Sequence, residues 1–174
     1  MDLFALTCRL VDIESITPNE GAVGDFLLDE LRRRGFEARK MSVEGTRENV
    51  VATSKGYPSP AVVFSTHMDT VPPFIPSSDD ATRIYGRGSC DAKGIIAAQV
   101  SAAEKLREEG IHVGLLFLVG EERDSLGAKC ANRVPIGSRF LVNGEPTENK
   151  VAVASKGALR VELKAWVNFR PHEG

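Results

Sequence analysis

Two adjacent glutamates, Glu121 and Glu122, follow a run of seven largely apolar residues, 113–119, after a single glycine. A run of that length and composition predicts a strand buried on both faces. In an open α/β sheet, ligand crevices form at the carboxyl ends of the strands. Because successive residues of a strand point to opposite sides, one glutamate could bind a metal ion while the other transfers a proton. A solvated acidic turn is the alternative interpretation of an isolated glutamate pair.

Three more side chains that can bind metals stand where predicted elements end or begin. His67 follows the apolar run 61–66, Asp91 precedes a helix expected over residues 92–109, and Glu145 follows the next short apolar run. Imidazole and carboxylate groups without a cysteine cluster suit Zn²⁺, and also Co²⁺ or Mn²⁺.

Each of these residues also has a purely structural interpretation. His67 could be a hydrogen-bonded core histidine, Asp91 a helix N-cap, and Glu145, which precedes a proline, a turn residue. All of them nevertheless fall at loop edges after predicted strands. That coincidence favours a shared metal site built from His67, Asp91, Glu122 and Glu145.

The elements that must position these residues follow from hydrophobic periodicity and from turn residues. Helices are expected over residues 2–13, 21–34, 92–109 and 125–133, and strands over 36–43, 48–54, 61–66, 113–119 and 139–143. Alternation of strands and helices predicts an α/β fold, a three-layer αβα sandwich with a mostly parallel mixed sheet. Residues 70–90 are expected to form a loop, and residues 158–169 a half-exposed antiparallel strand.

Composition excludes several classes of function. A formal net charge of -2 argues against a nucleic-acid-binding surface, which would concentrate Lys and Arg. The sequence has no apolar run of membrane-spanning length, and its first residues lack the basic region of a signal peptide. The three cysteines are widely spaced, which is typical of reduced thiols, so a cytoplasmic protein is expected.

Four motifs together resemble one enzyme family. They are Ser65–Pro72, Gly86–Gly94, Gly120–Ala128 and Gly144–Thr147. In this order and spacing they are similar to the di-zinc amidohydrolases and exopeptidases that include acetylornithine deacetylase, succinyl-diaminopimelate desuccinylase, aminoacylase and glutamate carboxypeptidase. The resemblance implies a zinc-exopeptidase-like fold.

The resemblance also implies a role for each candidate ligand. Asp91 would bridge two zinc ions, His67 and Glu145 would complete one site, and Glu122 would bind the other ion. The peptide bond after Asp91 is often cis in such proteins.

Two further residues would serve the reaction. Asp69 would hydrogen-bond the imidazole of His67, and Glu121 would be the general base for a water activated between the two zinc ions. The expected substrate is a small N-acyl amino acid or peptide, cleaved as in a deacetylase or desuccinylase. A dipeptidase or carboxypeptidase of the same family is an alternative, as is a metal-binding or interaction module that retains the fold without catalysis.

The sequence departs from the family pattern in its last part. No histidine corresponds to the distal ligand of the second zinc site, and the segment that should open a lid domain is altered around residues 166–169. We therefore expect residues 1–156 to form the N-terminal lobe of the catalytic domain, with its C-terminal part absent. Residues 157–174 would be the stub of a lid or dimerisation domain, through which a homodimer would form. One zinc should bind firmly and the second weakly or not at all.

Overall fold

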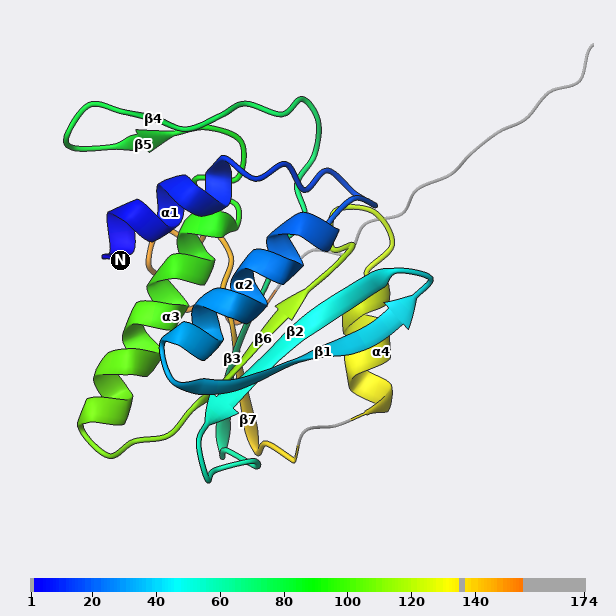
Figure 1. Ribbon diagram of the computed structural model, residues 1–174, viewed down its shortest axis with the longest axis vertical. Helices are drawn as coiled ribbons and strands as arrows, with labels where there is room; N and C mark the ends of the chain where they lie inside the picture. Colours follow the sequence, from blue (N-terminus) through cyan, green and yellow to red (C-terminus); the bar gives the residue numbers. More distant parts are fainter. Residues whose placement is uncertain (1, 135–136, 155–174) are drawn as a thin grey trace, which may run out of the picture.

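A five-stranded mixed sheet runs through the computed structural model, which describes residues 2–134 and 137–154 (Figure 1). The strands are β1 (Phe36–Glu44), β2 (Arg47–Ser54), β3 (Val62–His67), β6 (Gly114–Leu118) and β7 (Phe140–Asn143), in the spatial order β1-β2-β6-β3-β7. The pairs β3–β6 and β3–β7 are parallel, whereas β1–β2 and β2–β6 are antiparallel. The expected mixed sheet is confirmed, with its parallel part on the side of β3.

The parallel register brings several strand ends to one edge of the sheet. His67 at the end of β3 lies opposite Leu118 at the end of β6, and Ser65 lies opposite Asn143 at the end of β7. The residues that follow β3, β6 and β7 therefore emerge side by side.

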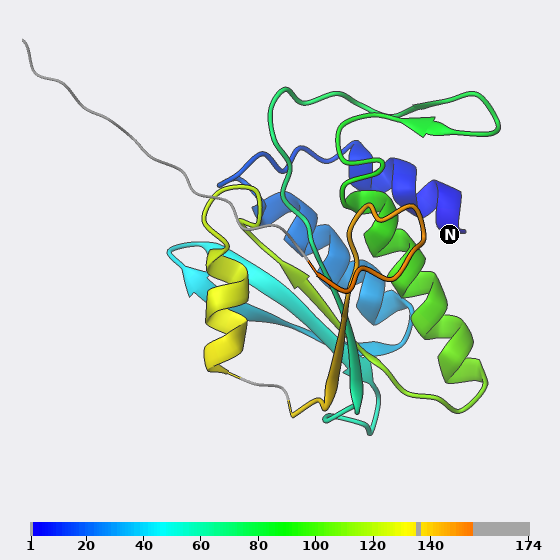
Figure 2. The same cartoon turned by 180° about the vertical axis from the view of Figure 1, so that it is seen from behind.

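Helices cover both faces of the sheet (Figures 1 and 2). Helices α1 (Leu3–Val11), α2 (Gly21–Arg33) and α3 (Lys93–Glu108) lie on one face, where their apolar side chains form the main core with the sheet. Helix α4 (Leu126–Arg133) lies on the other face, where Cys130 and Ala131 pack against a smaller cluster that includes Val51 and Leu116. The predicted three-layer arrangement is confirmed.

Helix ends follow the chemistry of their sequences. The side chain of Asp2 accepts a hydrogen bond from the backbone N–H of Ala5 at 2.8 Å, which satisfies an otherwise free donor in the first turn of α1. Helix α2 is followed by Gly35, which has a positive φ of 81°. Residues with a side chain rarely adopt this conformation, so glycine suits the end of the helix. No helix within residues 2–134 and 137–154 is long and apolar enough to cross a membrane.

The segment 70–90 contains more structure than expected. It includes a short hairpin of β4 (Ser78–Asp79) and β5 (Ile84–Tyr85), whose turn is closed by the carboxylate of Asp80. Strands of two residues have no periodicity that a sequence could reveal. The strand expected over residues 158–169 and the lid stub expected over 157–174 lie outside the described residues, so both remain predictions.

Candidate metal centre

His67 lies at the centre of the candidate site. It is the last residue of β3, and its side chain is only 1% exposed. Its Nδ1 lies 3.0 Å from the backbone oxygen of Asp69, and its Nε2 lies 2.8 Å from Oδ1 of Asp91. A carbonyl oxygen can only accept, so Nδ1 is the donor and Nε2 faces the acidic groups.

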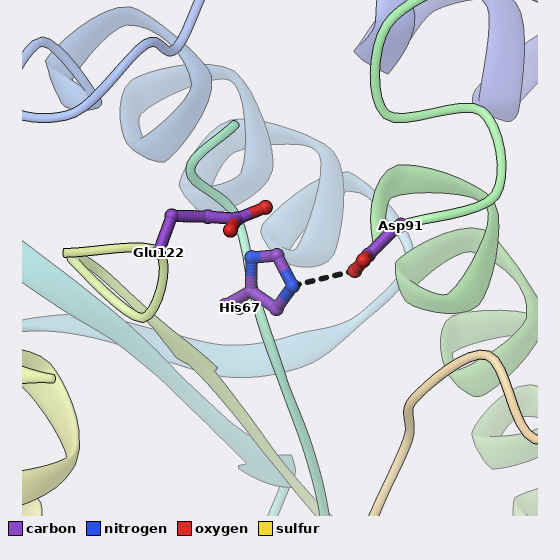
Figure 3. A group of neighbouring side chains, drawn as sticks. All are labelled: His67, Asp91 and Glu122. Atoms are coloured by element: carbon purple, nitrogen blue, oxygen red, sulfur yellow. Dashed lines mark hydrogen bonds and ion pairs between the residues drawn. The ribbon is translucent and has the colours of Figure 1, made fainter. Parts of the chain in front are cut away.

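Asp91 and Glu122 reach the imidazole from two separate loops. Figure 3 shows their side chains pointing toward His67 from opposite sides, with Asp91 in the loop before α3 and Glu122 in the loop after β6. The potential ligand atoms of the three residues all lie within 4.8 Å of one another. The peptide bond after Asp91 is cis, as the resemblance implies.

Glu145 stands beside this group at the rim of the sheet. Its Oε2 lies 3.9 Å from Nε2 of His67. The preceding residue, Gly144, fixes the chain here, since its N–H donates to the oxygen of Ser65 at 2.7 Å and its own oxygen accepts from the hydroxyl of Thr66 at 2.8 Å. The structure therefore brings all four predicted ligands to one edge of the sheet.

Asp69 is fully buried and contacts more than the imidazole. One carboxylate oxygen lies 3.4 Å from Nδ1 of His67, which is farther than the backbone oxygen of the same residue. The carboxylate accepts from the backbone N–H groups of Glu121 at 3.0 Å and Glu122 at 3.2 Å, and from the hydroxyl of Thr17 at 2.6 Å. Asp69 thus connects the histidine to the loop that carries both glutamates.

Glu121 is exposed and lines a hollow of about 320 Å³ beside the site. His67 and Glu145 line the same hollow, together with apolar side chains such as Leu116 and Leu118. A carboxylate at this position can meet a molecule that enters from solvent, because the hollow opens between β7 and α4.

The charges of the site explain its pKa values. Burial alone would lower the pKa of His67, but the carboxylates of Asp69 and Asp91 outweigh it and raise that pKa to about 10. Burial raises the pKa of Glu122 and of Glu145; His67 opposes this rise, and the negative charge of Asp91 adds to it. Burial would also raise the pKa of Asp69, yet its hydrogen bonds with His67 and Thr17 lower it.

These groups fit a divalent metal ion. Nε2 of His67 lies 2.8 Å from a carboxylate oxygen of Asp91 and 3.9 Å from one of Glu145. A divalent cation that replaced the proton on Nε2 would contact an imidazole nitrogen and carboxylate oxygens and balance more of their negative charge than that proton does. One imidazole with several carboxylates is the donor set expected for Zn²⁺, Co²⁺ or Mn²⁺.

In the described part of the chain, the one other histidine does not add to this set. His112 lies away from the site, where its ring stacks on Tyr57 with 3.5 Å between the ring centroids. His172 lies outside the described residues.

Comparison with protein families gives this geometry a context. Residues 63–171 match the model of peptidase family M20/M25/M40. The chain belongs to this family. The matched range contains every predicted ligand, and the family resemblance inferred from the sequence motifs is confirmed.

Relatives of the chain include other M20 proteins from fungi. A peptidase M20 domain-containing protein of Schizosaccharomyces pombe is 40% identical over 99% of this chain and 46% of its own length. A probable carboxypeptidase of Aspergillus flavus is 40% identical over 90% of this chain and 42% of its own length. The chain thus spans less than half the length of either relative.

Solved structures share the fold. Aminopeptidase PepT from Bacillus cereus matches with a TM-score of 0.69 and 24% identity, over 82% of this chain and 42% of that one. A tripeptidase from Staphylococcus aureus matches with a TM-score of 0.62 and 26% identity, over 76% of this chain and 39% of that one. Membership of a metallopeptidase family implies a divalent metal, which agrees with the donor set described above.

Sequence reasoning missed the contribution of Thr17. Nothing in the segment Ser15–Pro18 indicates a contact with a residue 52 positions away. In the structure the segment lies against the extension of β3, with a bridge between Ile16 and Thr70.

Proposed function

We propose that the chain is the metal-binding lobe of an M20 hydrolase that cleaves the amide bond of a peptide or N-acyl amino acid. The convergence of His67, Asp91 and Glu122 within 4.8 Å, beside Glu145, supports this proposal most strongly. The exposed carboxylate of Glu121 adds a proton acceptor at the same edge of the sheet.

Zinc is the metal we propose, with Co²⁺ or Mn²⁺ as substitutes. His67, Asp91 and Glu145 would hold one ion, and Asp91 and Glu122 would hold a second. When bound, the metal would acidify a water molecule and polarise the substrate carbonyl. Three side chains serve the first site and two serve the second, so we infer one firmly bound ion and one weakly bound ion.

The residues of the chain would then share the remaining tasks. Glu121 would accept the proton of the attacking water and donate it to the departing amine. Asp69 would keep the imidazole of His67 in one orientation, and the same carboxylate would fix the backbone of Glu121 and Glu122. The hollow beside Glu121 would admit the substrate because it is lined by both apolar and ligand side chains.

We propose a peptide with a free C-terminal residue as the substrate, as the names of the fungal relatives suggest. Such a peptide is chemically an N-acyl amino acid whose acyl group is itself a peptide. The deacylase interpretation, of the acetylornithine deacetylase and desuccinylase type, was the first expectation from the sequence. It concerns the same kind of bond and is here the second candidate. The proposal also includes the domain organisation expected from the sequence. Residues 1–156 would form the lobe, and residues 157–174 would begin a lid domain through which a homodimer forms.

An assay with two substrate panels tests this function. The chain, stripped of metal and then supplied with Zn²⁺ or Co²⁺, would be incubated with short peptides and with N-acetylated amino acids, and released amine would be measured. The proposal predicts metal-dependent cleavage of peptides that Glu121→Gln slows by about 10²–10⁴. Faster cleavage of N-acetylated amino acids would favour the deacylase. Metal binding without cleavage of either panel would indicate the non-catalytic module instead.

A further inference from the structure

The loop between β6 and α4 is closed at its base by one buried side chain. The oxygen of the Asn49 side chain accepts from the backbone N–H of Val119 at 3.1 Å, and its amide nitrogen donates to the backbone oxygen of Gly127 at 2.9 Å. The N–H of Gly127 also donates to the oxygen of Val119 at 3.1 Å. Asn49 therefore contacts both ends of the segment 119–127, which carries Glu121 and Glu122.

Asn49 lies one residue beyond the end of the regular pairing between β2 and β6. The pairing of β2 with β6 runs from Ala52 to Val50, which lies opposite Phe117. One residue farther along β2, the side chain of Asn49 takes the place of the backbone and reaches Val119 across the gap. The side-chain amide of asparagine can replace a backbone peptide group in this pairing, because it too has a carbonyl acceptor and an N–H donor.

The base of the loop is buried and tightly packed. The side chain of Asn49 is 0% exposed, so a donor or acceptor left unpaired here could not form a hydrogen bond with water. A Cβ atom placed on Gly127 would lie 2.5 Å from Oδ1 of Asn49 and 2.5 Å from the oxygen of Val119. Glycine at position 127 is therefore required for the close approach that the Asn49 contacts create.

The far end of the loop is held separately. The carboxylate of Asp69 binds the N–H groups of Glu121 and Glu122, as described above. Arg47, whose guanidinium makes two hydrogen bonds to the buried Glu20, lies 3.6 Å from Asp124. Asn49 contacts the base of the loop, so its hydrogen bonds fix the positions of the first and last residues of segment 119–127 relative to β3.

We propose that Asn49 is a positioning residue for the proposed reaction. By fixing both ends of segment 119–127, it keeps the carboxylates of Glu121 and Glu122 at the edge of the sheet where His67 ends. The part of this inference that concerns metal and proton transfer depends on the proposed function; the clamp on the loop does not.

Amide hydrogen exchange on the metal-free protein tests the clamp directly. Asn49→Leu fills the same space without the two hydrogen bonds, and Val50→Ala, on the opposite face of β2, is the matched control that weakens the core alone. The readout is the exchange rate of the Glu121 and Glu122 amides relative to that of the Leu115 amide in β6. We expect Asn49→Leu to raise this ratio by about 5- to 100-fold, the effect of losing a buried hydrogen bond, and Val50→Ala to leave it unchanged.

Zinc titration then tests the consequence for the site. Asn49→Leu should weaken binding of the second zinc ion, the one proposed for Asp91 and Glu122, by about 10- to 100-fold, as expected when a group that orients a ligand is lost. The first ion should keep its affinity, and Val50→Ala should weaken neither. If Asn49→Leu does not fold, Gly127→Ala disturbs the same contacts from the other side and should raise the same exchange ratio.

The two readouts fail separately. An unchanged exchange ratio in Asn49→Leu, or an equal rise in Val50→Ala, would overturn the role of Asn49 whatever the metal does. A raised ratio with unchanged affinity for the second zinc ion would support the clamp and contradict the ligand role of Glu122 in the proposed function.

Discussion

Replacing Asp69 with asparagine probes the connection between the histidine and the two glutamates. The carboxylate of Asp69 is 0% exposed and accepts hydrogen bonds from Thr17, Glu121 and Glu122. Asparagine has the same shape, but one of its two polar atoms is a donor. The hydroxyl of Thr17 can rotate to accept from that donor, whereas a backbone N–H cannot.

The expected loss of stability follows from this count. In either orientation of the new amide, one backbone N–H of the glutamate pair faces another donor and stays unpaired. A buried unsatisfied group costs about 1–3 kcal/mol, and the lost charge weakens the remaining bonds as well. We therefore expect Asp69→Asn to lower the free energy of unfolding of the metal-free protein by about 2–4 kcal/mol.

Urea denaturation of both proteins without metal measures this difference. Asp80→Asn is the matched control, because Asp80 also accepts several hydrogen bonds, from Thr82, Arg83 and Tyr85, but does so in solvent. Its effect should be clearly smaller. A loss below about 0.5 kcal/mol in Asp69→Asn, the range of ordinary surface substitutions, would refute the reasoning about the buried carboxylate.

Three further predictions concern the reaction, the metal and the fold. Glu121→Gln should keep its affinity for zinc and lose about 10²–10⁴ in kcat; near-normal turnover in a peptide cleavage assay would exclude Glu121 as the base. Elemental analysis after dialysis should find about one zinc per chain, because among the described residues the proposal assigns just Asp91 and Glu122 to the second ion; two retained ions would contradict this. The hydrogen bond from Arg33 lowers the pKa of Glu30 below its ordinary value of 4.5, so Glu30 stabilises the fold above that pH and loses this effect as pH falls through its native pKa. Glu30→Gln should therefore be less stable than the natural protein at pH 7, and urea titrations should show the gap closing in acid; a gap independent of pH would disprove the ion-pair explanation.

The layers of the fold could be predicted from sequence because each depends on a local pattern. The apolar run before Glu121 predicted a buried strand and the segment after Asp91 predicted a helix, and both are present as β6 and α3. The antiparallel pairing of β2 with β6 could not be read in the same way. It joins residues such as Val50 and Phe117, which are far apart in the chain, and the pattern of a buried strand does not record the direction of its neighbour.

The candidate site, too, could be predicted from the sequence only in part. Its ligand candidates could be found because each follows a strand or precedes a helix, and parallel strands end at one edge. Thr17, which donates a hydrogen bond to Asp69, and Asn49, which bonds to both ends of the loop of Glu121 and Glu122, could not be identified from the sequence. Their partners lie 52 to 78 positions away, and neither a threonine before a proline nor an asparagine within a predicted strand indicates so distant a partner.

Crystals grown with Zn²⁺ and measured at the zinc absorption edge would test the central claim most directly. The account predicts an anomalous peak within about 2.0–2.2 Å of Nε2 of His67 and of a carboxylate oxygen of Asp91. Zinc bound elsewhere on the chain, with no peak between these two residues, would contradict it.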